Sequence, residues 1–345
     1  MAQSLVWNLV ADISKKGGIS EIVINSPKNI FVERGGKFIQ INASFPEEEI
    51  QKFVQEVAEF NQKECNKDTP ILDGNLPDGS RINIISPPFV SGTPAISIRR
   101  YLKLATSFDQ SPEIFGLDGE WIRVLKAMVR AKMNIVVSGG TGVGKTTFLN
   151  LMLAEIDKIE RVITIEDTLE LSLQMPNLVR LEAGGKSRYS KASLAIRDLV
   201  KNTLRMRPDR IIIGESRGPE LFDLLQAMNT GHEGSMTSIH SNSCGECLSR
   251  METLFLMAGF DIPLSVVRKQ ISTGVDFIIQ LGRDTEGKRV VTEIMELNGM
   301  EGNTVLSTMI AKRSDGELRF QGITPKRIDR LHRDADLPLN YFENF

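Results

Sequence analysis

Residues 139–147, Gly-Gly-Thr-Gly-Val-Gly-Lys-Thr-Thr, carry the clearest chemistry in this chain. They fit the pattern G-x-x-x-x-G-K-S/T of a phosphate-binding P-loop. Glycines let successive backbone N–H groups turn towards a phosphate, and a helix N-terminus adds partial positive charge. Lys145 would reach the β- and γ-phosphates, and the Thr146 hydroxyl would hold Mg²⁺. The predicted nucleotide-binding residues are Gly140, Thr141, Gly142, Val143, Gly144, Lys145, Thr146 and Thr147.

The segments on either side of this loop have the order that such chemistry requires. Residues 134–138 are a short apolar run of strand type. After the loop, apolar residues recur at helical spacing as far as Ile156. A glycine-rich turn without a ligand would need neither flank, so we predict strand, phosphate loop and helix.

Two further apolar strands end in acidic residues. Residues 162–165 lead into Glu166 and Asp167, and residues 210–213 lead into Gly214 and Glu215. Ligands of α/β sheets bind at the carboxyl ends of the strands. Glu166 could polarise an attacking water, and Glu215 has the Walker B position that approaches Mg²⁺ and water. Because Gly214 stands where an aspartate is usual, the division of labour between the two glutamates stays open.

Two of the three histidines, His232 and His240, bracket the apolar segment 235–239. His240 at the end of a strand could contact the γ-phosphate or sense its loss. The alternative is a pair of hydrogen-bonded core histidines. No third ligand is evident, so the spacing does not indicate a zinc site.

Three arginines, Arg81, Arg99 and Arg100, lie outside the segment that carries the phosphate loop. Such arginines are candidates for fingers that reach a phosphate in trans. Without other support, the ordinary interpretation is solvation or pairing with carboxylates.

Cys244 and Cys247 form a C-x-x-C pair, and Cys65 is the only other cysteine. Three thiols cannot build a four-thiolate zinc site. Their helical spacing favours buried or partly exposed thiols over metal or redox work.

Composition limits the class of protein. The 345 residues suffice for two domains, and 41% hydrophobic with 25% charged residues is ordinary for a globular protein. The net charge of −2 gives no global basic field for nucleic acid or membrane. No apolar stretch approaches the ~20 residues of a membrane span. The N-terminus lacks the features of a secretion signal, and few cysteines suit a reducing compartment. We expect a cytoplasmic protein whose membrane role is peripheral at most.

Periodicity predicts an N-terminal α/β domain over 1–102, a linker over 103–117 and a second domain over 118–345. The first domain should contain a helix over 46–60, a hairpin turn at 34–37, and strands at 21–25, 30–34, 38–41, 81–85 and 95–100. Asp118 should cap the helix that opens the second domain. There, strands at 134–138, 161–166, 210–214 and 235–239 alternate with helices, which indicates a mostly parallel sheet covered on both faces. Residues 290–297 alternate like a further strand.

With these motifs in place, the chain resembles the secretion ATPases that power pilus assembly and type II and type IV secretion. The motifs look like that family's Walker A, Asp box, Walker B and His box in the family's order. They lie at 139–147, 164–167, 205–210, 214–218 and 230–240. Within the family, the chain is most similar to the CpaF-like branch of tight-adherence (Tad or Flp) pilus ATPases, through residues 76–81, 226–232 and 298–302.

The resemblance implies a RecA-like P-loop NTPase motor domain behind a smaller N-terminal α/β (PAS-like) domain. It also implies a homohexameric ring with ATP between subunits and inner-membrane platform proteins as partners. In that ring Arg81, Arg99 and Arg100 would lie around the phosphates. Asn75 departs from the family, which usually has an arginine at that place.

We therefore expect an Mg²⁺-dependent ATPase that forms ADP and phosphate and drives Tad/Flp pilus assembly by domain motion about residues 103–117. Lys145, Glu166, Glu215, His240 and the three arginines would be catalytic, with Thr146 and Glu215 on the metal. One alternative is a traffic ATPase of type IV secretion. Another is a DNA-translocating ring motor, against which the net charge of −2 argues. A third is a scaffold that binds ATP without useful hydrolysis.

Overall fold

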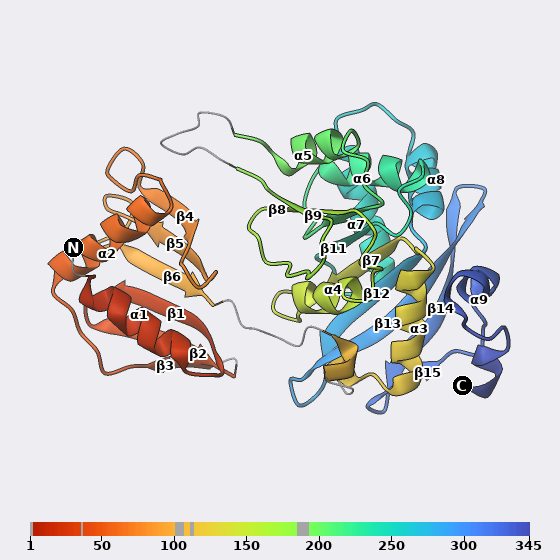
Figure 1. The fold of residues 1–345 in the computed structure, drawn as a ribbon, viewed down its shortest axis with the longest axis horizontal. Coiled ribbons are helices and arrows are strands. Elements are labelled where there is room, and N and C mark those ends of the chain that lie inside the picture. Colours follow the sequence, from red (N-terminus) through yellow and green to blue (C-terminus); the bar gives the residue numbers. More distant parts are fainter. Residues whose placement is uncertain (1–2, 36, 101–106, 111–113, 185–192) are drawn as a thin grey trace. The chain divides into compact units, whose positions relative to one another are not determined.

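A computed structural model describes residues 3–35, 37–100, 107–110, 114–184 and 193–345, and the chain divides into two units (Figure 1). Residues 1–103 belong to the first unit, and residues 104–184 and 194–345 to the second. In the described part of the chain, no helix is both long and apolar enough to span a membrane.

The first unit is an antiparallel sheet with two helices on one face. The strand order is β3-β2-β1-β6-β5-β4. The strands are β1 (Ile19–Ser26), β2 (Asn29–Arg34), β3 (Lys37–Gln40), β4 (Ile71–Asn75), β5 (Arg81–Ile85) and β6 (Ala95–Arg99). Alternate strand residues such as Ile22, Ile82 and Ile98 are buried with apolar residues of α1 (Leu5–Lys15) and α2 (Glu47–Phe60). The predicted β2–β3 hairpin is present, and Gly36 of its turn lies outside the described residues.

Two elements of this unit were not predicted from the sequence. Helix α1 begins after Ser4, whose Oγ accepts from the Trp7 N–H at 3.2 Å and donates to Glu56 at 2.6 Å. Glu56 lies on α2, so a contact distant in sequence secures this short helix. Strand β4 contains Asp73, Gly74 and Asn75, which are residue types that strands disfavour.

The second unit is built on a nine-stranded sheet of order β15-β14-β13-β12-β7-β11-β10-β8-β9. From β12 to β9 every pair is parallel, and β13, β14 and β15 extend the sheet as antiparallel strands. The strands are β7 (Ile135–Gly139), β8 (Val162–Glu166), β9 (Leu178–Glu182), β10 (Arg210–Ile213), β11 (Met236–Ile239), β12 (Phe277–Arg283), β13 (Arg289–Glu301), β14 (Thr304–Ser314) and β15 (Glu317–Phe320). The four predicted parallel strands and the strand over 290–297 are confirmed, and β9, β12, β14 and β15 are additions.

Helices cover both faces of this sheet. One core contains residues of α3 (Gly119–Arg130), α4 (Lys145–Leu153) and α9 (Ile328–Ala335). The other contains residues of α5 (Ile196–Thr203), α6 (Glu220–Asn229), α7 (Cys244–Leu256) and α8 (Leu264–Gly274). Along β7, Ile135 and Val137 face the first core and Val136 the second. Two buried faces explain why these strands read as continuous apolar runs.

The predicted linker over 103–117 needs a correction in its described part. Residues 103–106 and 111–113 lie outside the described residues. The remainder forms two short turns of helix, η1 (Phe108–Gln110) and η2 (Ile114–Gly116). Phe108 and Phe115 are buried edge-on against Phe148, with ring centroids 6.2 and 5.1 Å away. This end of the segment is therefore part of the core that contains α3, α4 and α9. The predicted cap follows it, because Asp118 accepts from the Trp121 N–H at 2.8 Å.

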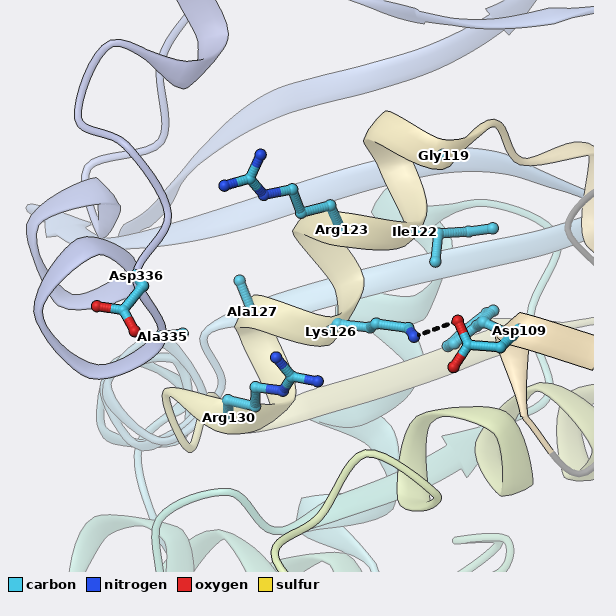
Figure 2. Close-up of a pocket in the computed structure, with 10 residues that line it drawn as sticks. Asp109, Gly119, Ile122, Arg123, Lys126, Ala127, Arg130, Ala335 and Asp336 are labelled. Atoms are coloured by element: carbon cyan, nitrogen blue, oxygen red, sulfur yellow. Dashed lines mark hydrogen bonds and ion pairs between the residues drawn. The ribbon is translucent and has the colours of Figure 1, made fainter.

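An open hollow of about 560 Å³ lies along α3, and Figure 2 shows Arg123, Lys126 and Arg130 on its wall. Lys126 contacts Asp109 at 2.7 Å and Glu155 at 3.2 Å, and Arg130 contacts Glu155 at 3.0 Å. These two cations are thus already paired with carboxylates. The hollow contains no residue of the phosphate loop, so we do not assign a nucleotide to it.

A buried ion pair fixes the start of β10. The Arg210 guanidinium donates to both carboxylate oxygens of Glu160, at 2.8 and 2.9 Å, and to the Val129 carbonyl at 2.8 Å. The Arg210 side chain is 1% exposed, and that of Glu160 is 11% exposed. A Cβ at Gly234 would lie 2.6 Å from Arg210 Nη1, so a glycine there leaves room for the guanidinium.

Glu160→Gln should lower the free energy of unfolding of the second unit by about 3 kcal/mol, because it leaves a buried guanidinium charge uncompensated. Urea unfolding at pH 7, followed by Trp121 fluorescence in a Trp7→Phe background, measures this. Glu317→Gln, on an exposed carboxylate, is the control and should change the value by less than about 0.5 kcal/mol. Equal effects of the two substitutions would contradict the importance of the pair.

Candidate functional site

The parallel strands bring the predicted residues to one edge of the sheet. Strand β7 lies between β12 and β11, and β10 and β8 follow beyond β11. Because parallel strands share one carboxyl edge, Gly140 after β7, His240 after β11, Glu215 near the end of β10 and Glu166 at the end of β8 lie along it.

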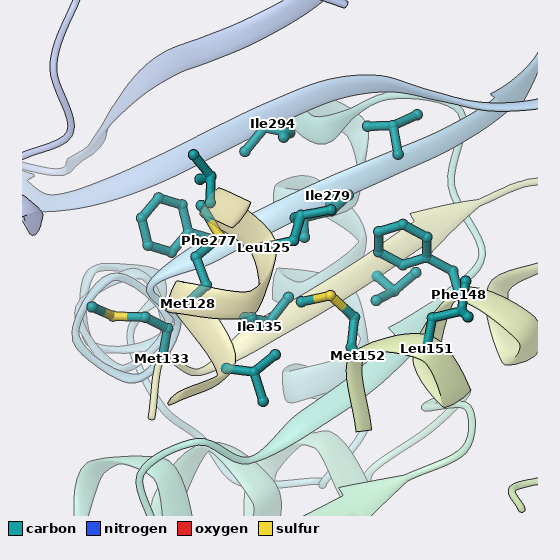
Figure 3. Close-up of a cluster of buried hydrophobic side chains, with 14 of the residues drawn as sticks. Leu125, Met128, Met133, Ile135, Phe148, Leu151, Met152, Phe277, Ile279 and Ile294 are labelled. Carbon is teal, nitrogen blue, oxygen red and sulfur yellow. The ribbon is translucent and has the colours of Figure 1, made fainter. Parts of the chain in front are cut away.

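The phosphate loop is held between β7 and α4. Helix α4 is anchored by Phe148, Leu151 and Met152, which Figure 3 shows in the apolar core with Ile135 and Ile279. The Lys145 ammonium donates to the carbonyls of Gly139 at 2.9 Å and Gly140 at 3.1 Å. It also lies 3.7 Å from Glu215 Oε1. The lysine therefore reaches across the loop towards the acid of the Walker B strand.

Thr146 follows this lysine and contacts an acid that the sequence did not single out. Its hydroxyl donates to Glu170 Oε2 at 3.1 Å. With Glu215 this provides hydroxyl and carboxylate oxygens, the ligand type that Mg²⁺ prefers. Among the described residues, no group of three or more acidic, histidine or cysteine side chains forms a ready metal cage. The donors fit an ion such as Mg²⁺, which commonly takes one or two carboxylates together with substrate phosphates.

Glu166 is the buried acid of the site. Its Oε1 accepts from the backbone N–H groups of Glu170 and Leu171, each at 2.8 Å. Its Oε2 is buried without a hydrogen-bond partner. Burial raises the pKa of Glu166 from 4.5 to about 7. Such a carboxyl can change its protonation near neutral pH.

The contact between Glu166 and Gly214 explains the departure from the usual Walker B pattern. A Cβ on Gly214 would lie 3.0 Å from Glu166 Cγ. An aspartate at 214 would therefore crowd the buried carboxyl. The carboxyl side chain that packs against Gly214 is that of Glu166, from the neighbouring strand β8.

Glu215 lies between two cations, Lys145 and Arg217. Arg217 Nε donates to its Oε2 at 2.9 Å, and Arg217 Nη2 contacts the same oxygen. Arg217 Nη1 also lies 3.6 Å from Asp167. Behind the acid, the Ser216 hydroxyl bonds to that of Thr237 at 2.8 Å, which ties the chain after β10 to β11.

The two motif histidines have different surroundings. His240 is exposed and directly follows β11, whose Ile239 pairs with Ser138 immediately before the phosphate loop. His232 Nδ1 lies 3.3 Å from the Ala227 carbonyl at the end of α6. The strand register thus places His240 beside the loop, whereas His232 has a structural contact.

In the first unit, Arg81 and Arg99 lie together, whereas Arg100 has different contacts. Arg81 of β5 and Arg99 of β6 are register partners, on the face opposite the buried Ile82 and Ile98. Arg100 instead donates to the carbonyls of Lys16 at 2.9 Å and Ile19 at 3.3 Å, and it also contacts Ser14 at the end of α1. Arg100 therefore secures α1, and the finger role predicted for the trio suits Arg81 and Arg99 better.

Cys244 and Cys247 are both buried, which agrees with the buried or partly exposed thiols that their helical spacing predicted. Burial raises the pKa of the Cys247 thiol to about 12 and that of Cys244 well above its usual range. These thiols are packing groups of α7.

Sequence reasoning did not select Glu170, Arg217 or Arg283. Glu170 lies four residues after Glu166, and Arg217 lies two residues after Glu215. Only their contacts in the folded chain, with Thr146 and Glu215, distinguish them from other polar residues nearby. Arg283 ends β12, and its Nη2 donates to the Gly142 carbonyl at 3.0 Å. No local pattern marks that arginine.

Together, the sheet, the phosphate loop and the acidic strand ends define a RecA-like P-loop fold. Residues 8–314 match the family described as "Type II/IV secretion system protein", and the chain belongs to that family.

Named relatives agree with this membership. The chain is 33% identical over 289 residues to the conjugal transfer protein TrbB of Rhizobium radiobacter, covering 83% of this chain and 85% of TrbB. It is 31% identical over 324 residues to the type IV secretion system protein VirB11 of Bartonella henselae, covering 83% and 90%. The fold resembles that of the Legionella pneumophila ATPase DotB, with a TM-score of 0.63, 20% identity, and 84% and 80% coverage.

Glu166→Gln should stabilise the second unit more at pH 8 than at pH 5. With a folded pKa of about 7 against an ordinary value of 4.5, the stability that the protonated Glu166 contributes is lost as pH rises through that interval. A neutral amide can still accept from the Glu170 and Leu171 N–H groups and does not titrate. Urea unfolding followed by Trp121 fluorescence, in the Trp7→Phe background with EDTA, gives the difference in stability between the proteins with and without Glu166→Gln at each pH. Equal differences at the two pH values would rule out a raised pKa.

Proposed function

We propose that this chain is an Mg²⁺-dependent ATPase that powers a secretion apparatus of the type IV kind. The observation that carries the proposal is the phosphate loop, with Lys145 directed to Glu215 and Thr146 to Glu170 at the acidic edge of the sheet. Membership of the secretion family supports the assignment.

The residues of the loop would bind and neutralise the phosphates. The N–H groups of residues 140–147 would surround the β-phosphate, and Lys145 would exchange its carbonyl and Glu215 contacts for phosphate oxygens. Glu215 and Glu166 would place the metal and the attacking water, and exposed His240 would report the state of the γ-phosphate.

Thr146 and Glu215 would hold the Mg²⁺, with Glu170 close to the Thr146 hydroxyl. When bound, this ion neutralises negative charge on the phosphates. The contribution of the chain is to present oxygen ligands beside the loop and to leave room for the nucleotide.

The end of the segment joining the two units touches the phosphate loop, which supports coupling of hydrolysis to domain motion. A Cβ at Gly144 would lie 3.1 Å from Phe115 Cζ, and Phe115 also packs on Phe148. A change in the loop on phosphate release would therefore act directly on Phe115. Motion of one unit against the other would deliver the work.

The names of the relatives favour type IV secretion over the Tad pilus that the sequence motifs first suggested. TrbB is named for conjugal transfer and VirB11 for type IV secretion. The pilus remains the second candidate, supported by residues 76–81, 226–232 and 298–302, which fit the CpaF-like branch. Either role places the protein on the cytoplasmic side of the inner membrane, acting on membrane platform proteins.

Both roles call for a ring, for which we propose a homohexamer. Arg81 and Arg99 lie side by side on one sheet face, a suitable arrangement for reaching the phosphates of the next subunit. The other wall of the site would then belong to a second copy of the chain.

Deleting the gene in its host, and restoring it with the wild-type or Lys145→Ala sequence, distinguishes the two apparatuses. Loss of substrate transfer with intact surface pili supports type IV secretion. Loss of pili with intact transfer supports the pilus role and overturns our first choice.

Lys145→Ala should reduce ATP turnover by about a hundredfold or more, because it removes the positive charge that stabilises the transferring phosphoryl group. Phosphate release measured with Mg²⁺ and ATP tests this, with circular dichroism as the check on folding. Lys15→Ala, on an exposed lysine of α1, is the control. Undiminished phosphate release from Lys145→Ala would overturn the ATPase assignment.

Arg81→Ala and Lys145→Ala should each be poorly active alone and regain activity when their subunits are mixed. In mixed rings about a quarter of the interfaces would pair an intact Lys145 with an intact Arg81 from the next subunit. Mixing Lys145→Ala with Thr146→Ala is the control, because both substitutions damage the same wall. Absence of any gain on mixing would contradict action in trans.

A further inference from the structure

The hairpin that joins β12 to β13 reaches the phosphate loop from outside. Arg283 and Arg289 are cross-strand partners at the mouth of this hairpin. The Arg283 guanidinium bridges two carbonyls, donating from Nη2 to Gly142 at 3.0 Å and from Nη1 to Gly287 at 2.7 Å. One side chain thus links the hairpin to the loop.

The hairpin is an ordered support for this arginine. Asp284 Oδ1 accepts from the N–H groups of Glu286 at 2.9 Å and Lys288 at 2.8 Å. The Asp284 N–H donates to the Lys288 carbonyl at 2.9 Å. These bonds fix the turn, so the guanidinium is presented by a defined backbone.

The phosphate loop is closely packed where the hairpin meets it. Gly142 and Gly144 have φ values of +72° and +95°, which side chains other than glycine rarely adopt. A Cβ at Gly144 would lie 3.0 Å from Arg289 Cδ. On this side of the loop, Arg289 therefore packs against Gly144, and Arg283 donates a hydrogen bond to the Gly142 carbonyl.

The bond to Gly142 has a consequence for the opposite side of the loop. In a trans peptide unit the C=O and the following N–H point in opposite directions. Holding the Gly142 carbonyl towards Arg283 directs the Val143 N–H away from it. A P-loop uses such inward N–H groups to bind phosphate.

We propose that Arg283 is a positioning residue that holds the Gly142–Val143 peptide in its phosphate-binding orientation. Arg283 acts through the backbone, and Lys145 remains the side chain that meets the phosphate. This role rests on the proposed ATPase function. Its signature is a loss of nucleotide affinity with the chemical step preserved.

Arg283→Met should raise KM for ATP and Kd for ADP about fivefold, the effect of losing one hydrogen bond, with kcat within about twofold of wild type. Arg283→Lys keeps the charge but offers one nitrogen in place of the two that donate to Gly142 and Gly287, so its KM should lie between those of Met and wild type. Steady-state phosphate release and titration with a fluorescent ADP analogue give these values. Arg319→Met, on the neighbouring β14–β15 hairpin and paired only with surface acids in the contacts described, is the matched control.

Hydrogen exchange of the 139–147 amides adds a second readout. Without nucleotide, Arg283→Met should exchange faster than wild type there, and Arg319→Met should not. If KM and exchange are unchanged in folded Arg283→Met and Arg283→Lys, the positioning role is wrong while the ATPase function stands. A fall in kcat at constant KM would also overturn it. Failure of wild type itself to bind ATP would instead reject the proposed function.

Discussion

The packing around Gly144 is the constraint on which the nucleotide site depends. At this residue the backbone takes a left-handed conformation, and a Cβ would lie only 3.0 Å from Arg289 Cδ and 3.1 Å from Phe115 Cζ. The same residue ends the phosphate loop and precedes α4, whose Phe148 touches Phe115. The loop, the end of the interdomain segment and the β12–β13 hairpin therefore meet at one point of the backbone. A shift in any one of them would press on the others, because little space remains between them.

The acidic edge of the sheet shows how one site gives similar side chains different environments. Glu166 is buried, with one oxygen saturated by backbone N–H groups and the other without a partner. Glu215 is partly exposed and lies between Lys145 and Arg217. Burial raises the pKa of Glu166 to about 7, whereas Glu215 keeps contact with cations that phosphate oxygens would also attract. The glycine at 214 leaves room for the buried Glu166 side chain, whose Cγ would lie 3.0 Å from a Cβ there.

The edge itself exists because six parallel strands end together between two apolar cores. Continuous burial of β7, β8, β10 and β11 sets the strands, and the Arg210–Glu160 pair fixes where β10 starts. Ser216 and Thr237 then join the ends of neighbouring segments. Rigid strands therefore place charged groups that would otherwise be far apart in the chain. The first unit uses sheet alternation instead, which brings Arg81 and Arg99 to one face while Arg100 caps α1.

The sequence by itself determined the phosphate loop, the parallel strands and the acids at their ends. Those features depend on local patterns: the glycine spacing at 139–147, apolar runs buried on both faces, and the position of an acid after a strand. It did not reveal α1 or β4, because Glu56 secures the first and the second is made of poor strand formers. Only the tertiary structure assigned Glu170 to Thr146, Arg283 to Gly142 and Phe115 to Gly144. It also moved the end of the expected linker into the core. Each of these contacts joins residues from different elements, and the distance between such residues is set by packing, which no local spacing in the chain records.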